Sequence, residues 1–142
     1  MIDYGYSRSE YYSPLRMEGT LALYRNQQRQ ENMFEAIGET DITAHVDFTA
    51  IAEAGLEAGC QLLGFTDQHH FMVGAGESRM RSLENSEGGK DGDQFLRGYK
   101  TLMHPEMMGL AFKYVLMGKG ILTAEKPSGF RYASEAKKVL GL

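Results

Sequence analysis

Residues 41–48 alternate strictly between polar and apolar side chains. The polar positions are Asp41, Thr43, His45 and Asp47, and the apolar positions are Ile42, Ala44, Val46 and Phe48. Successive side chains of a strand point to opposite faces, so this octet predicts one half-buried strand. Two interpretations of its polar face stay open. It is either a solvated surface or a face that carries a histidine and two carboxylates into a reaction site.

A helix is predicted directly after the octet, over residues 48–58. Apolar side chains recur there at helical spacing, at Phe48, Ile51, Ala52 and Leu56. Asp47 stands where a helix N-cap is expected, because its carboxylate can accept a hydrogen bond from the first turn. Gly59 follows the last periodic residue and predicts the helix end.

The remaining elements complete an alternating pattern in one domain. Strands are expected at the start (Met1–Tyr4) and over 19–24, 61–65 and 110–117. Further helices are expected over 77–84, from an N-cap at Asp93 to 103, and over 134–140. Loops are expected over 6–19 and 119–132, an exposed polar run over 26–32, and a flexible loop over 85–92. The order of strands and helices indicates an α/β layer structure.

Composition narrows the class of protein. The chain has 142 residues, of which 42% are hydrophobic and 24% charged, and its net charge is −4. These values indicate a globular domain, and the absence of a basic stripe argues against nucleic-acid binding. The most apolar run, 110–117, is short and contains Lys113, so no membrane segment or targeting peptide is expected. The single cysteine fits a reducing compartment, which indicates a soluble cytoplasmic protein.

His45 and Asp47 are the chemical candidates within the octet. In an extended strand they lie about 7 Å apart, close enough to line one pocket, whereas Asp41 and Asp47 lie about 20 Å apart. His45 stands between a strand and a helix N-terminus, where α/β proteins place ligands. Asp47 alone is equally well explained as an N-cap.

A metal site is an alternative. His45 and Asp47 together with a distant His69, His70 or His104 could supply two histidines and a carboxylate to non-haem iron. The pattern is too short to be specific. Neither a G-x-G-x-x-G motif nor a Walker-type phosphate loop is present in the sequence.

Four stretches carry a resemblance to a known family. They are IDYGY (2–6), GTLALYR (19–25), DITAHVDF (41–48) and MGLAFKYVLM (108–117). Together they resemble the C-terminal part of the S-adenosyl-L-methionine-dependent methyltransferases of the MidA type, a family that includes the mitochondrial complex I assembly arginine methyltransferase. The resemblance covers most of residues 1–117 and little of the tail over 120–142.

The resemblance implies a Rossmann-like class I methyltransferase sheet that ends in an antiparallel strand. Its fifth, sixth and seventh strands correspond to residues 1–4, 61–65 and 110–117. The family's glycine-rich cofactor loop has no counterpart in the sequence. We therefore expect a partial domain whose first residue corresponds to an internal methionine of the complete enzyme. Such a chain should bind S-adenosyl-L-methionine weakly and be inactive alone.

The resemblance also assigns roles to site residues and partners. His45 is the expected proton acceptor and Asp47 the expected carboxylate that grips an arginine substrate. Substrate-binding roles fall to Asp3, Tyr4, Asp41 and Thr43, and a cofactor-binding role to Gly5. The implied substrate is a protein, with a respiratory complex I subunit as one candidate, in the mitochondrion if the source is eukaryotic; a homo-oligomer is also expected.

Two other functions remain as alternatives. One is a non-catalytic α/β module that binds a partner, or a degenerate remnant of the enzyme. The other is the non-haem metal enzyme that uses His45 and Asp47.

Overall fold

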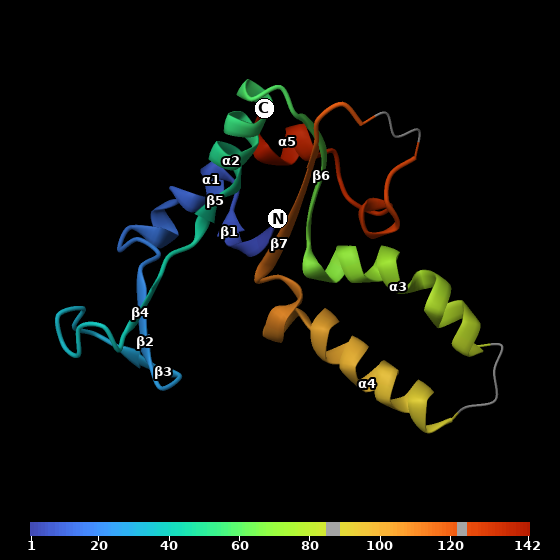
Figure 1. The fold of residues 1–142 in the computed structure, drawn as a ribbon, viewed down its shortest axis with the longest axis horizontal. Helices are drawn as coiled ribbons and strands as arrows, with labels where there is room; N and C mark the ends of the chain where they lie inside the picture. Colours follow the sequence, from blue (N-terminus) through green and yellow to red (C-terminus); the bar gives the residue numbers. More distant parts are fainter. Residues whose placement is uncertain (85–88, 122–124) are drawn as a thin grey trace.

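The computed structural model describes residues 1–84, 89–121 and 125–142. The strands in these ranges form two separate sheets (Figure 1). The larger sheet has the order β5-β1-β7-β6, with β1 (Ile2–Tyr6), β5 (Val46–Asp47), β6 (Gln61–Asp67) and β7 (Phe112–Gly118). The smaller sheet has the order β3-β2-β4, with β2 (Ala22–Arg25), β3 (Gln28–Gln30) and β4 (Asp41–Thr43). This smaller sheet projects from the larger one, and we call residues 20–43 the arm.

The antiparallel strand expected near residues 110–117 is confirmed. β7 lies between β1 and β6 and runs antiparallel to both. Its branched and aromatic residues suit a strand that has neighbours on both sides. The structure is therefore a mixed α/β fold with antiparallel strands, as predicted, while its position as the C-terminal part of a larger sheet stays a prediction.

The prediction of one strand over residues 41–48 is wrong. Hydrogen-bonded pairing is broken at Ala44 and His45, so β4 belongs to the arm and β5 to the larger sheet. Ile42 is 61% exposed, so the apolar face of β4 is not buried. Alternation in the sequence therefore does not mark one continuous buried face.

Helix α2 (Phe48–Glu57) is confirmed with both of its expected ends. The Oδ1 atom of Asp47 accepts a hydrogen bond from the Ala50 backbone N–H at 3.1 Å, which is the N-cap contact. Gly59 has a φ of +78°, the left-handed conformation that closes many helices.

The hydrophobic core lies where α2 and α5 (Ala136–Leu140) pack on the larger sheet. Its buried members are Phe48, Ala52, Phe65, Val115 and Leu140. The hydroxyl of Thr49 donates to the Leu140 carbonyl at 2.9 Å and accepts from the Arg8 N–H at 3.0 Å. This hydroxyl thus joins α1 (Arg8–Tyr11), α2 and α5 at one point.

A pair of long helices leaves the larger sheet at the edge opposite to the arm (Figure 1). They are α3 (Gln68–Glu84) and α4 (Lys90–Met103), and both begin earlier than predicted. His69 and His70 therefore lie in a first helical turn. Of the flexible loop predicted over 85–92, residues 85–88 lie outside the described part of the chain.

Glycines explain the missed start of α3. Glycine lowers helix propensity, and Gly74 and Gly76 both fall in the segment that was not predicted. The Cα of Gly76 packs on the Tyr99 ring, where a Cβ would clash. Tyr99 in turn donates a hydrogen bond to the Met72 carbonyl at 2.7 Å. The glycine costs helix stability locally but permits α3 and α4 to approach.

Shorter turns complete the fold. A short helix, α1, and a 3-10 turn over Pro14–Arg16 occupy part of the predicted loop 6–19, and β3 occupies part of the predicted exposed run 26–32. Two further turns span Pro105–Gly109 and Ser128–Phe130. Within the three described ranges, none of the helices has the length and apolar character needed to cross a bilayer.

The close approach of β1 and β5 yields a first prediction. An alanine Cβ at Gly5 would overlap the Val46 carbonyl and lie 2.8 Å from the Phe48 ring. Overpacking of this kind costs about 1–3 kcal/mol, so Gly5→Ala should lower the free energy of unfolding by that amount in urea denaturation.

Gly98→Ala is the matched control for that measurement. Gly98 lies inside α4 with open space around its Cα. Alanine there should raise stability by roughly 0.5–1 kcal/mol, because glycine is a poor helix residue. Equal stability of the two variants would contradict the packing described for β1 and β5.

Candidate functional site

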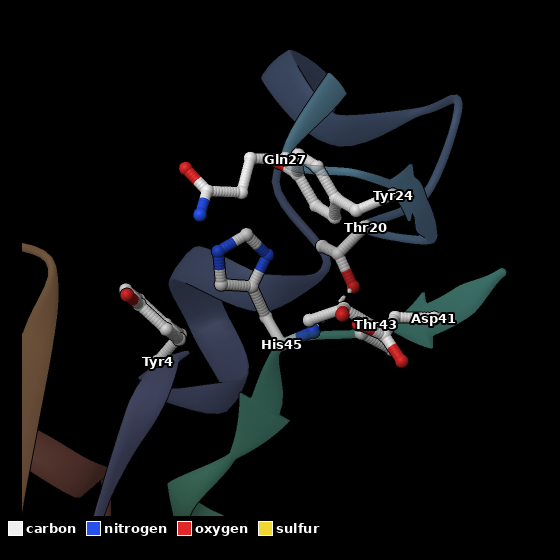
Figure 2. A pocket seen from close by; sticks show the side chains of 8 residues that line it. Tyr4, Thr20, Tyr24, Gln27, Asp41, Thr43 and His45 are labelled. Atoms are coloured by element: carbon white, nitrogen blue, oxygen red, sulfur yellow. Dashed lines mark hydrogen bonds between the residues drawn. The ribbon is translucent and has the colours of Figure 1, made fainter. Parts of the chain in front are cut away.

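A pocket of about 570 Å³ opens at the break between β4 and β5 (Figure 2). It is lined by residues from β1, the arm and the break itself: Tyr4, Thr20, Tyr24, Gln27, Asp41, Thr43, Ala44 and His45. Four of the residues expected at a site from the sequence are thus brought together, namely Tyr4, Asp41, Thr43 and His45. The break in the octet creates the pocket, because it lets the arm stand away from the larger sheet.

Hydrogen bonds fix the chain at the break. The backbone N–H of His45 donates to the Thr20 hydroxyl at 3.1 Å. The Tyr11 hydroxyl lies 3.3 Å from the same Thr20 oxygen. The base of the arm is therefore bonded both to the break and to α1. Because the His45 backbone is held in place, the direction in which its side chain leaves the backbone is also fixed.

The imidazole of His45 is half-buried among aromatic rings. Its ring centroid lies 5.1 Å from that of Tyr6 and 6.3 Å from that of Tyr4, the second contact being edge-on. The Nδ1 atom is shielded from solvent and has no hydrogen-bond partner within the described residues. Buried polar atoms are nearly always paired, so the unpaired Nδ1 atom makes His45 a candidate for contact with a ligand or a water molecule.

Electrostatics keep this imidazole neutral. Burial is the main cause that lowers the pKa of His45 below its usual 6.5, and the nearby Arg16 charge lowers it further. Asp3 acts in the opposite direction. Arg16 is held over the Tyr6 ring, 3.7 Å from its centroid, and donates to the Glu10 carbonyl at 2.6 Å. At neutral pH the imidazole can therefore accept a proton.

Asp47 lies outside the pocket lining. Besides its cap contact, its Oδ2 atom accepts a hydrogen bond from the Arg8 Nε at 3.2 Å. Arg8 also donates to both carboxylate oxygens of Glu53, at 2.8 and 2.5 Å. These hydrogen bonds raise the pKa of Arg8 and lower the pKa of Glu53. Asp47 thus takes part in an ion-pair network that fastens α1 to α2.

Asp3 and Gly5 also lie outside the lining of this pocket. The Asp3 carboxylate accepts a hydrogen bond from the Tyr4 backbone N–H at 2.8 Å. Gly5 is buried beneath the Val46 carbonyl and the Phe48 ring. The cofactor role expected for Gly5 stays a prediction.

The histidines expected for a metal site are not brought together. Over residues 1–84, 89–121 and 125–142, no three histidine, cysteine or carboxylate side chains are placed to share an ion. The His69 Nδ1 lies 2.9 Å from the Met103 carbonyl, and the His70 Nδ1 lies 2.7 Å from the Asp67 carboxylate. The structure gives no support to the metal hypothesis.

Sequence reasoning missed three residues that the arm contributes to the pocket, Thr20, Tyr24 and Gln27. Thr20 and Tyr24 belong to the GTLALYR stretch that carried the family resemblance. The resemblance therefore pointed to this stretch but gave its residues no role at the site. Gln27 lies in a polar run with no pattern. Its position becomes apparent once the pairing of β2 with β3 and β4 is known.

Comparisons with known proteins point to one family. Residues 1–66 match the family described as "Putative S-adenosyl-L-methionine-dependent methyltransferase". An 80-residue segment is 38% identical to the mitochondrial protein arginine methyltransferase NDUFAF7 of Xenopus laevis. The crystal structure of an uncharacterised protein from Burkholderia thailandensis matches with a TM-score of 0.82 and 32% identity. Over the matched residues the chain is similar to S-adenosyl-L-methionine-dependent methyltransferases of the MidA type.

A second similar structure from Burkholderia thailandensis contains a bound ligand. It matches with a TM-score of 0.81 and 34% identity, and it is bound to S-adenosyl-homocysteine. Each structural match covers 96% of this chain, but only 36% and 35% of the respective solved chains. The segment matched to the Xenopus protein covers 54% of this chain and 18% of that protein. The chain therefore spans a minor part of the length of these relatives.

The surroundings of His45 yield a prediction for its titration. Its imidazole pKa, followed by NMR through the ring C–H signals, should lie below 6.5. Arg16→Gln should raise that pKa and Asp3→Asn should lower it, because the two charges act in opposite directions. A pKa above 6.5 in the native chain would contradict the burial of the ring.

Stability should follow the same titration. Because the folded-state pKa of His45 lies below the unfolded value, the unfolded chain binds a proton first as the pH falls. The contribution of His45 is therefore fully present above about pH 6.5 and is lost as the pH falls towards the folded-state pKa. Replacement of His45 by glutamine should remove this part of the pH dependence of the melting temperature.

Proposed function

We propose that the chain carries the acceptor side of an S-adenosyl-L-methionine-dependent methyltransferase that modifies a protein arginine. The observation that carries this proposal is the unpaired Nδ1 atom of His45 in the same pocket as the Asp41 carboxylate. The family relationship and the relative with bound S-adenosyl-homocysteine support the cofactor. The name of the Xenopus relative supports the arginine acceptor.

The pocket suits a planar cation. Neither lysine nor arginine lines it, and within the described residues Asp41 forms no ion pair, so its charge is available to a ligand. A carboxylate can receive two parallel hydrogen bonds from one guanidinium. The rings of Tyr4 and Tyr24 line the same space, and aromatic faces attract a guanidinium. Asp41 would therefore hold the acceptor and the rings would shield it from water.

His45 would receive the proton that methylation releases. Transfer of the methyl group would break its bond to the sulfonium sulfur of S-adenosyl-L-methionine, form an N–C bond on a guanidinium nitrogen and release S-adenosyl-homocysteine. That nitrogen would then have to give up a proton. In the Nε2–H tautomer of the neutral ring, the Nδ1 of His45 has a lone pair with no competing partner in the described structure. A positioned acceptor of this kind typically speeds a reaction by about a hundred- to ten-thousand-fold.

The same pocket does not fit the cofactor. S-adenosyl-L-methionine carries an amino-acid end whose carboxylate is best held by a cationic side chain, and the lining offers the Asp41 carboxylate and no cation. The resemblance gave the cofactor role to Gly5, but the Val46 carbonyl and the Phe48 ring cover this residue. We therefore assign the pocket to the acceptor alone.

A partner-binding module is the second candidate. The arm exposes large apolar side chains at its tip, with Phe34 76% and Ile37 79% accessible to solvent. Contiguous exposed apolar surface is common at protein interfaces. In this alternative the arm binds a partner protein and the pocket has no catalytic role in methyl transfer.

Two variants test the catalytic proposal in the active enzyme. His45→Gln should lower kcat by about a hundred- to ten-thousand-fold, because the proton acceptor is lost. Asp41→Asn should instead raise KM for an arginine peptide by about tenfold or more, because the charge-assisted hydrogen bonds are weakened. The measurement is transfer of labelled methyl groups from S-adenosyl-L-methionine to that peptide.

Asp47→Asn is the matched control. Asparagine keeps an N-cap oxygen, and Asp47 does not line the pocket, so kcat and KM should stay at the native values. Native rates in His45→Gln would reject the proposed role of this histidine. A native protein that binds a partner through the arm and transfers no methyl group would favour the second candidate.

A further inference from the structure

The turn between β2 and β3 has an unusual backbone. Arg25 pairs with Gln28, which leaves Asn26 and Gln27 as the two residues of a tight hairpin turn. Both have positive φ values, 50° and 62°. Two consecutive left-handed residues define the type I′ turn, whose twist matches that of paired strands.

Gln27 is the wrong residue for a stable turn of this type. Glycine is strongly preferred at its second position, because a Cβ crowds the backbone in the left-handed region. Asparagine at the first position is ordinary, whereas a long side chain such as glutamine is seldom found in this conformation. Strained residues of this kind persist mainly where function requires their side chains.

Contacts within the chain do not account for the glutamine. Gln27 is exposed, and its amide forms no hydrogen bond with any described residue. Its neighbour Gln28 serves the turn through the backbone, since the Gln28 carbonyl accepts a hydrogen bond from the Gln30 side chain at 3.1 Å. The Gln27 side chain therefore contributes no intramolecular hydrogen bond that would offset the strain.

The Gln27 side chain reaches the pocket instead. It is part of the pocket lining, and Figure 2 shows its amide pointing from the arm towards the space beside the His45 and Tyr4 rings. Asp41 lies on the other strand of the arm that borders the same pocket. The pocket thus has a neutral amide group at one side and a carboxylate at another.

We infer that Gln27 binds the methyl acceptor and selects a guanidinium over an ammonium, an inference that rests on the proposed function. A guanidinium presents five N–H groups in a plane, along more than one edge. The Asp41 carboxylate would take one edge, and the Gln27 Oε1 would accept a hydrogen bond from another. A lysine ammonium is compact and cannot span both oxygens in this way.

Two glycine substitutions in the same turn test this inference. Gln27→Gly relieves the strain and should raise the melting temperature by about 1–4 °C. In the active enzyme it should also raise KM for an arginine peptide by about tenfold, with kcat nearly unchanged, because a hydrogen bond to a charged group is lost. Its preference for the arginine peptide over the matched lysine peptide should shrink by the same factor.

Asn26→Gly is the matched control. It relieves positive φ at the neighbouring position, and Asn26 does not line the pocket. It should raise the melting temperature slightly and leave KM and the arginine preference at native values.

The outcomes separate the inference from the proposed function. Unchanged KM and peptide preference in Gln27→Gly, with native methyl transfer intact, would overturn the inference alone. A lower melting temperature in Gln27→Gly would also overturn it, since it would show a structural role. Absence of methyl transfer in the native enzyme would overturn the proposed function and this inference with it.

Discussion

The structure depends on the pairing of Gly5 and Tyr6 with Val46 and Asp47. This short parallel contact requires a glycine, since the Val46 carbonyl and the Phe48 ring occupy the place of a Cβ. It delivers Phe48 into the core with no exposed surface and starts α2 at the next position. β4, which precedes this pairing in the chain, belongs to the smaller sheet, so the chain departs into the arm at the break that borders the pocket.

The same constraint gives the pocket its chemistry. At the break the Nδ1 atom of His45 is shielded from solvent and has no hydrogen-bond partner among the described residues. Burial and the Arg16 charge then keep the ring neutral. An unpaired buried atom and a strained turn residue both reduce stability, and the two residues concerned, His45 and Gln27, line one pocket. Their coincidence is the strongest structural argument that this pocket binds something.

The sequence predicted single elements better than their arrangement. Helix α2 and strand β7 were correct because periodicity, capping and branched residues all agreed. The octet misled because alternation cannot distinguish one strand from two short strands in different sheets. The start of α3 was hidden by glycines that serve packing against Tyr99 and Ser128. At the site, His45 and Asp41 carried a local or family signal, whereas Gln27 depends on a hairpin pairing that no short pattern reveals.

A crystal structure of the active enzyme with S-adenosyl-homocysteine and an arginine-containing peptide would test the central claim most directly. We predict that the guanidinium lies in the pocket at the break, with its nitrogens within hydrogen-bond distance of the Asp41 carboxylate and the His45 Nδ1. A guanidinium bound elsewhere, with this pocket empty or filled by the cofactor, would contradict it.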